Sequence, residues 1–238
     1  MAAQRTQRYP RLLITIDGPA GSGKSTVAQR LADRLGLDYL DTGAMYRAAA
    51  LLALERGIDA EDGPTLAGAL RQAELRFDWH ASPPPIMIGD RDISRRIRDM
   101  DVSAIVSPVS ARGEVRAVLV EQQRRIAREH PHLVTEGRDQ GSAVFPDASV
   151  RFYLDAEPGV RAERRRKQLA ETGRPVGAAQ VMNDIARRDR IDSTRADAPL
   201  TRPIGAIVVD TTNLSLDEVV DRLEASVREH LAVSRSEP

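Results

Sequence analysis

The chain of 238 residues contains no cysteine, few aromatic residues and no long hydrophobic run. Without cysteine there is no disulfide framework, no thiolate nucleophile and no cysteine-ligated zinc site. Aromatic residues make up 3% of the chain, which argues against a stacking platform for single-stranded nucleic acid. A formal net charge of +0 gives no overall field that would attract nucleic acid or a membrane surface. Since no apolar run approaches bilayer-spanning length, we expect neither nucleic acid nor a membrane as a partner.

The remaining composition is that of an ordinary globular protein, with 41% hydrophobic and 29% charged residues. The length suits one α/β domain with insertions, or a core with a small satellite. Residues 1–11 are polar and lack the apolar segment of a signal peptide. We therefore expect a cytoplasmic protein.

A glycine-rich stretch from Gly18 to Ser25 fits the phosphate-loop pattern G-x-x-x-x-G-K-[ST]. Apolar residues at 12–16 predict a buried strand before it, and helical spacing over 27–35 predicts a helix after it. Backbone N–H groups and the helix N-terminus then form a cradle for phosphate. Lys24 would neutralise the outer phosphates, and the Ser25 hydroxyl would hold Mg²⁺. The residues predicted to bind the ATP phosphates are Gly18, Pro19, Ala20, Gly21, Ser22, Gly23, Lys24, Ser25 and Thr26.

The plain alternative is a chance match, or a loop that binds phosphate only for structural reasons. The strand before the loop and the helix after it argue against both. Lys24 is also one of only two lysines in a chain that otherwise uses arginine. A compact ammonium group fits inside such a loop, whereas a planar guanidinium does not.

Short apolar runs separated by helical patterns predict an α/β fold with a mostly parallel five-stranded sheet. Residues 73–94 break this rhythm, because strand-like segments flank three consecutive prolines and predict a small antiparallel appendage. A capping box from Ser215 to Glu218 marks the start of the last helix. The strands are predicted at 12–16, 37–40, 132–135, 150–154 and 206–209.

Three groups of polar residues recur near predicted strand ends, at 41–47, 136–139 and 187–199. Each group alone is a weak signal, because an arginine-rich helix is usually a solvated face with paired side chains. Beside a phosphate loop, however, several arginines fit transfer between two phosphorylated molecules. They would neutralise the acceptor phosphate and the charge that develops during transfer.

Taken in order, these motifs resemble the bacterial cytidylate kinase family of the nucleoside monophosphate kinases. The resemblance runs from about residue 11 to residue 230 and is far more specific than the phosphate loop alone, which many folds share. It rests on residues 14–25, 40–47, 135–139, 144–148, 188–192 and 195–200.

The resemblance implies a P-loop fold of three layers, αβα, with a discontinuous core. The core would comprise residues 11–40, 96–160 and 200–232. Residues 41–95 would form the monophosphate-binding region with its antiparallel insert, and residues 161–199 a helical lid with the following arginine-rich helix.

The resemblance also assigns roles to single residues. Arg47 and Arg138 would hold the CMP phosphate, and Asp139 would recognise cytosine. The implied CMP-binding set is Thr42, Tyr46, Arg47, Ser107, Arg116, Arg138, Asp139, Arg188 and Asp192. The implied catalytic set is Lys24, Arg138, Arg188 and Arg195, and the lid arginines are Arg161, Arg164 and Arg165.

Two positions depart from the family pattern. Thr42 stands where serine is common, which preserves the hydroxyl, and Gln140 stands where an apolar residue is expected.

The base assignment also has a physical reason. Cytosine offers an amino group beside two acceptors, so a carboxylate such as Asp139 accepts from the amino group. Ser107 and Arg116 can donate to the two acceptors. Uracil would instead turn its O4 acceptor toward the anion, and unpaired buried groups then disfavour it strongly.

The expected reaction is direct transfer of the γ-phosphoryl group from ATP with Mg²⁺ to CMP or dCMP by a monomer. The alternatives are another monophosphate kinase acting on UMP, TMP or AMP, a small-metabolite kinase such as one for shikimate or gluconate, and a nucleotide-dependent switch protein. A GTP-dependent switch would need an N-K-x-D motif, and the chain has no Asn-Lys pair.

Overall fold

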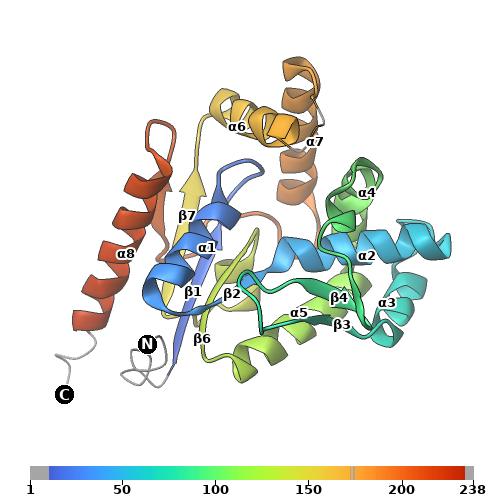
Figure 1. Cartoon of the computed structure of the whole chain (residues 1–238), viewed down its shortest axis with the longest axis horizontal. Coiled ribbons are helices and arrows are strands. Elements are labelled where there is room, and N and C mark those ends of the chain that lie inside the picture. The colour runs from blue at the N-terminus through green and yellow to red at the C-terminus, as the bar shows by residue number, and fades with distance from the viewer. Residues whose placement is uncertain (1–10, 172, 174, 234–238) are drawn as a thin grey trace.

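The computed structural model describes residues 11–171, 173 and 175–233 (Figure 1). Its core is a parallel sheet of five strands in the order β2-β6-β1-β7-β8, which confirms the predicted sheet. Each strand ends within one or two residues of its predicted bounds. We expect no signal peptide at residues 1–11. Residues 1–10 lie outside the described part of the chain. The strands are β1 (Leu12–Asp17), β2 (Asp38–Asp41), β6 (His132–Gly137), β7 (Val150–Asp155) and β8 (Ile207–Asp210).

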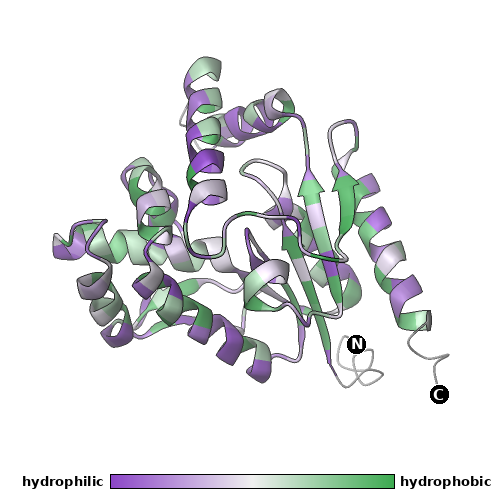
Figure 2. Cartoon of the chain, turned by 180° about the vertical axis from the view of Figure 1, so that it is seen from behind, coloured by the Kyte–Doolittle hydropathy of each residue, from purple (hydrophilic) through white to green (hydrophobic). Residues whose placement is uncertain are grey.

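Helices cover both faces of this sheet and complete the predicted three layers. Alternation along β1 places Ile14 and Ile16 in one hydrophobic cluster with α1 and α8, whereas Leu13 packs with α2 and α5 in another. Figure 2 shows hydrophobic residues concentrated in the central strands and hydrophilic residues alternating with them along the outer helices. These helices are α1 (Lys24–Leu35), α2 (Thr42–Arg56), α5 (Gly113–Glu129) and α8 (Leu216–Val233).

The predicted antiparallel appendage is confirmed as a second, three-stranded sheet in the order β3-β4-β5. It shares the hydrophobic cluster of α2 and α5 through Leu75, Phe77 and Ile86. Trp79 stacks on His130 after α5, with ring centroids 3.9 Å apart, and so ties the insert to the core. The insert and its flanking elements are α3 (Gly63–Gln72), β3 (Leu75–Phe77), β4 (Ile86–Ile88), β5 (Arg91–Asp92), a 3₁₀ turn (Arg96–Arg98) and α4 (Met100–Ser110).

Two further helices, α6 (Pro158–Glu171) and α7 (Ala178–Thr194), stand at the end of the sheet toward which β7 points (Figure 1). A small apolar cluster of Ala20, Ala162, Val181 and Ile185 packs both helices against the loop after β1. The division into core, monophosphate-binding region and lid stays a prediction. Among the described residues, no helix combines the length and the apolar character needed to cross a bilayer.

Candidate active site

Most of the sequence-predicted site residues line one cavity of about 580 Å³ at the carboxyl end of the parallel sheet. This is where an open α/β sheet leaves a crevice for ligands. The exceptions among the site residues are Gly18, Pro19, Arg116 and Arg161. The loop after β1 forms one wall, the start of α2 and the end of α4 form another, and α6 and α7 close the top. The loop that follows β8 also lines it, with Thr211, Leu214 and Leu216.

Close packing explains two glycines of the phosphate loop. A Cβ at Gly18 would lie 2.1 Å from the Leu154 carbonyl oxygen of β7, and Gly18 also has a φ of +151°. A Cβ at Gly21 would lie 2.9 Å from the Arg161 carbonyl oxygen, at a φ of +78°. Larger residues would push the loop away from both neighbours. The glycines therefore set how close the loop lies to β7 and α6.

Lys24 begins α1 and is buried, with 5% of its surface exposed. Its Nζ donates to the Pro19 carbonyl oxygen at 2.8 Å and to Ser22 Oγ at 3.4 Å. Burial and the nearby Arg138 guanidinium lower the pKa of Lys24. Both hydrogen-bond partners of the ammonium group are uncharged oxygens, so an anionic phosphate in their place would favour its charged form.

Ser25 and Glu136 place a hydroxyl and a carboxylate side by side at the mouth of the loop. Ser25 Oγ donates to Glu136 Oε1 at 2.7 Å, and Glu136 lies near the end of β6. Burial and the nearby Asp41 raise the pKa of Glu136. Hard oxygen donors of this kind suit Mg²⁺, so the residues present fit a magnesium ion carried by ATP.

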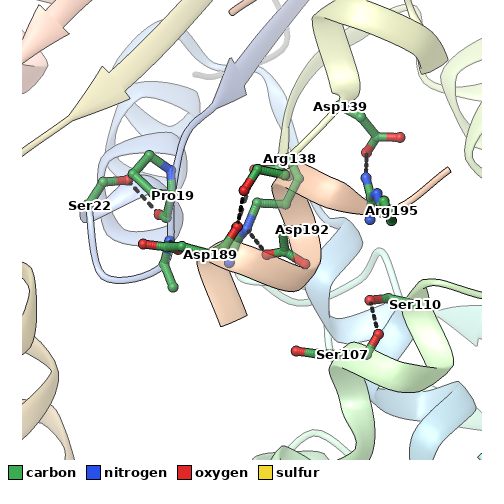
Figure 3. Close-up of polar contacts among 12 residues, drawn as sticks. Pro19, Ser22, Ser107, Ser110, Arg138, Asp139, Asp189, Asp192 and Arg195 are labelled. Carbon is green, nitrogen blue, oxygen red and sulfur yellow. Dashed lines mark hydrogen bonds and ion pairs between the residues drawn. The ribbon is translucent and has the colours of Figure 1, made fainter. Parts of the chain in front are cut away.

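Asp139 is buried where the chain leaves β6, and Figure 3 shows its pair with Arg195. Its Oδ2 accepts from Arg116, and its Oδ1 lies 3.5 Å from Arg195 Nη2. Arg116 also donates to the Tyr46 hydroxyl at 3.2 Å. Ser107 of α4 lines the same cavity. The structure thus brings together the residues implied to recognise cytosine, with Arg195 added to them.

Between this group and the phosphate loop lies a cluster of partly buried arginines. Arg47 donates to the Ile97 carbonyl oxygen at 3.2 Å and to Ser103 Oγ at 2.9 Å, both uncharged. The Nε of Arg188 is buried and has no hydrogen-bond partner among the described residues. Burial and neighbouring guanidinium groups lower the pKa of Arg47 to about 9 and that of Arg188 to about 10. Such crowded cations call for an anionic ligand.

Arg138 and Asp192 connect this cluster with α7. Arg138 Nε donates to Asp192 Oδ2 at 2.9 Å, and Nη1 donates to the Gly137 carbonyl oxygen at 3.3 Å. Thr42 Oγ1 donates to the Glu136 carbonyl oxygen at 2.6 Å, so it fixes the end of β6. The hydroxyl kept at position 42 therefore has a structural partner.

Three arginines of the catalytic and lid sets have partners in the structure. Arg195 donates to the Ala198 carbonyl oxygen at 2.7 Å and 2.9 Å and lies beside Asp139. Arg161 is buried under the phosphate loop, where it donates to the Ala20 carbonyl oxygen at 2.9 Å. Arg164 donates to Thr211 Oγ1 at 2.9 Å and to its carbonyl oxygen at 2.6 Å. Of the three arginines that the resemblance assigns to a lid, Arg164 and Arg165 line the cavity.

The structure also gives Gln140 a role. Its side-chain oxygen accepts from Thr135 Oγ1 at 3.0 Å, and its Nε2 donates to Gln123 Oε1 at 3.2 Å. A polar side chain is tolerated at this fully buried position because it has partners.

Two contributors to the site were not identified from the sequence. One is the loop after β8. Its Thr211 directly follows the end of a predicted strand, on the same edge of the sheet as the phosphate loop, and this position could have identified it as a site residue. The other is Asp17, which ends β1 and accepts from the backbone N–H groups of Gln140 at 2.8 Å and Gly141 at 2.7 Å. It fastens the loop that carries Arg138 and Asp139.

We expect Asp17→Asn to lower the free energy of unfolding by about 1–3 kcal/mol, since one buried N–H group loses its acceptor. Burial raises the pKa of Asp17 to about 6, so the carboxylate is ionised at pH 7 and accepts both bonds. Urea denaturation at pH 7 measures the change. Asp221→Asn, which alters an exposed pair with Arg34, should leave the midpoint unchanged. An Asp17→Asn midpoint equal to that of the wild type would contradict this role.

Comparison with known proteins agrees with the site. A family model described as cytidylate kinase matches residues 14–229. The cytidylate kinase of Nocardia farcinica is 43% identical over 226 residues, which span 95% of this chain and 97% of that protein. The cytidylate kinase of Shouchella clausii is 44% identical over 217 residues, or 91% and 96% of the two chains. An uncharacterized protein of Eubacterium ventriosum has a solved structure that covers 92% of this chain and 99% of its own, with 12% identity and a TM-score of 0.51; this likeness concerns the fold alone. The chain belongs to the cytidylate kinase family.

Proposed function

We propose that this protein transfers the γ-phosphoryl group of ATP to CMP or dCMP, giving ADP and CDP or dCDP. One observation carries the proposal. A single cavity holds a phosphate loop with its lysine at one end, the buried Asp139 carboxylate at the other, and incompletely neutralised arginines between them. The phosphate loop would bind the donor phosphates, the arginines would bind the acceptor phosphate, and Asp139 would bind the pyrimidine base.

The donor end is suited to ATP. The phosphate loop would hold the β- and γ-phosphates, and Lys24 would exchange its bond to the Pro19 carbonyl oxygen for a phosphate oxygen. The adenine would lie against Arg164 and the apolar side chains of Leu214 and Val219. Ser25 and Glu136 would hold Mg²⁺, which neutralises charge on the transferring phosphoryl group when it is bound.

The acceptor end needs no strong general base, because the CMP phosphate is already ionised. Arg47, Arg138 and Arg188 would hold it in line with the γ-phosphate and stabilise the charge that develops during transfer. Catalysis is then positioning together with charge neutralisation. The same arginines repel one another without a phosphate, so acceptor binding relieves an existing repulsion of like charges.

Water must be excluded, or ATP would be hydrolysed instead of donating to CMP. We propose that α6 and α7 close over the cavity as a lid, with Arg164 and Arg165 at its inner face. We also propose that residues 41–95 form the monophosphate-binding region, and that the protein acts as a cytoplasmic monomer without nucleic acid or membrane partners.

An ADP-release assay with each nucleoside monophosphate in turn tests the function. We expect rapid release with CMP and dCMP, much slower release with UMP, TMP and AMP, and little ATP hydrolysis without an acceptor. Equal rates with all acceptors would point to a broader monophosphate kinase. Slow release that ignores every acceptor would instead favour a switch protein and overturn the proposal.

A further inference from the structure

The tip of the phosphate loop is held by side chains from both lid helices. The Ala20 N–H donates to Asp189 Oδ1 of α7 at 3.0 Å, and the Ala20 carbonyl oxygen accepts from Arg161 Nη1 of α6 at 2.9 Å. The same Arg161 nitrogen donates to Asp189 Oδ2 at 2.5 Å. Asp189 and Arg161 thus form an ion pair that binds both backbone groups of Ala20.

Packing reinforces this attachment. The Ala20 side chain lies in the small apolar cluster with Ala162 of α6 and with Val181 and Ile185 of α7. Arg161 is itself anchored, because its Nε donates to the Ala156 carbonyl oxygen at 3.0 Å before α6 begins. The loop tip is therefore attached to the start of α6 and to residues 181–189 of α7.

The neighbours of Asp189 on α7 face the acceptor side. Arg188, the preceding residue, belongs to the arginine cluster, and Asp192, one turn later, accepts from Arg138 at 2.9 Å (Figure 3). One turn of α7 therefore touches the donor loop with Asp189 and the acceptor site with the residues on either side of it. A rotation of α7 that follows acceptor binding must move Asp189, and with it Ala20.

We propose that Asp189 and Arg161 are positioning residues that couple acceptor binding to the geometry of the phosphate loop. They do not touch the reacting atoms. Binding of CMP to the arginine cluster fixes α7, and α7 then holds the loop in the conformation that binds the ATP phosphates. By thermodynamic linkage, CMP should tighten ATP binding, and ATP should tighten CMP binding by the same factor. This inference rests on the proposed function.

Calorimetric titration of the full chain with the non-hydrolysable methylene analogue of ATP and Mg²⁺, with and without saturating CMP, tests the coupling. In the wild type we expect CMP to lower the Kd of the analogue by about fivefold or more. Asp189→Ala and Arg161→Met should bring this ratio close to one. Asp189→Asn should keep part of the coupling, since its Oδ1 can still accept from the Ala20 N–H group.

The control is Asp221→Asn, which removes the charge of another aspartate that joins two helices, α8 and α1, through Arg34 at the surface. In this variant, the ratio of the Kd of the ATP analogue without CMP to that with CMP should equal the wild-type ratio. The proposal is overturned if Asp189→Ala keeps the wild-type ratio, or if Asp221→Asn loses it equally. Should Asp189→Ala fail to fold, Asp189→Asn decides, because a full wild-type ratio or a complete loss in that variant would each contradict the proposed geometry.

Measurements on the wild-type protein distinguish a failure of the proposed function from a failure of the proposed coupling. If the wild type binds neither the analogue nor CMP, the proposed function fails. If it binds both and phosphorylates CMP, but CMP leaves the Kd of the analogue unchanged, only the coupling fails.

Discussion

Replacing Lys24 by methionine is expected to lower kcat by about 10³-fold, the cost of losing a preorganised charge at a reacting phosphoryl group. The ammonium group lies inside the phosphate loop and donates to the uncharged Pro19 carbonyl oxygen and Ser22 hydroxyl. Phosphate can displace these partners easily, so the charge is available to the transition state. Methionine fills the same space without it.

The fold should survive this change. Lys24 is 5% exposed, and replacing a buried charge by an apolar side chain of similar volume is often neutral or stabilising. The urea midpoint of Lys24→Met should therefore be no lower than that of the wild type. A single-turnover measurement of CDP formation at saturating ATP and CMP gives the loss in the chemical step.

Lys24→Arg is the matched variant, because it keeps the charge but not the shape. A planar guanidinium does not fit where a point charge is surrounded by loop carbonyl and hydroxyl oxygens. We expect a loss of the same order as for methionine. Full activity of Lys24→Arg would show that any cation at this end suffices, and a loss of less than tenfold in Lys24→Met would remove Lys24 from the catalytic set.

The phosphate loop and the strands were predictable because their signals are local. Glycine spacing, the apolar runs and the capping box of α8 depend on neighbouring residues only. Ser215 and Glu218 bond reciprocally, with the Ser215 N–H donating to Glu218 Oε2 at 2.8 Å and the Glu218 N–H donating to Ser215 Oγ at 3.3 Å.

Two helices of the insert region were not identified, for reasons visible in their composition. The helix α4 is rich in β-branched residues and contains Pro108, so its sequence lacks both helix propensity and a clean apolar stripe. The helix α3 begins with Gly63 and a proline, which look like a turn until Asp62 is seen to cap the helix by accepting from Thr65 N–H at 3.1 Å.

The spacing of the arginines along the sequence did not predict which residues their side chains contact. In α7, Arg187 is exposed and pairs weakly with Asp184 at 3.7 Å, whereas Arg188 beside it enters the active-site cavity. The sequence did not predict the contact of Arg195 with Asp139, because that contact joins residues far apart in the chain. Only the packing of α7 against α6 and α4 distinguishes these cases.

The buried carboxylate of Asp139 leads to the second large effect, a change of base preference. Alanine is a poor probe here, because it removes both acceptor oxygens together with the charge that pairs with Arg116 and Arg195, and breaking a buried pair costs about 3–5 kcal/mol of stability. Asparagine also removes the charge, but it keeps the shape and one acceptor oxygen. That oxygen should turn toward the arginines, since the amide NH₂ would be repelled by them.

The amide introduced by Asp139→Asn would then face the base with its NH₂ group. Cytosine would meet a donor opposite its own amino group, whereas uracil would offer O4 as an acceptor. We expect Asp139→Asn to lower the ratio of kcat/KM for CMP over UMP by at least about 10²-fold, since sites built on hydrogen bonds discriminate by this much or more. Most of the change should come from CMP.

Asp17→Asn provides the control that separates base recognition from loop distortion. Asp17 is also buried, and it holds the same loop through the Gln140 and Gly141 N–H groups without lining the cavity. Loosening the loop should slow CMP and UMP by similar factors, because the arginines that hold phosphate move as well. The CMP to UMP ratio therefore distinguishes the two variants: it should fall in Asp139→Asn and stay near the wild-type value in Asp17→Asn. If Asp139→Asn keeps the wild-type ratio, the base is recognised elsewhere, and the arginines around Asp139 serve only to fold the loop.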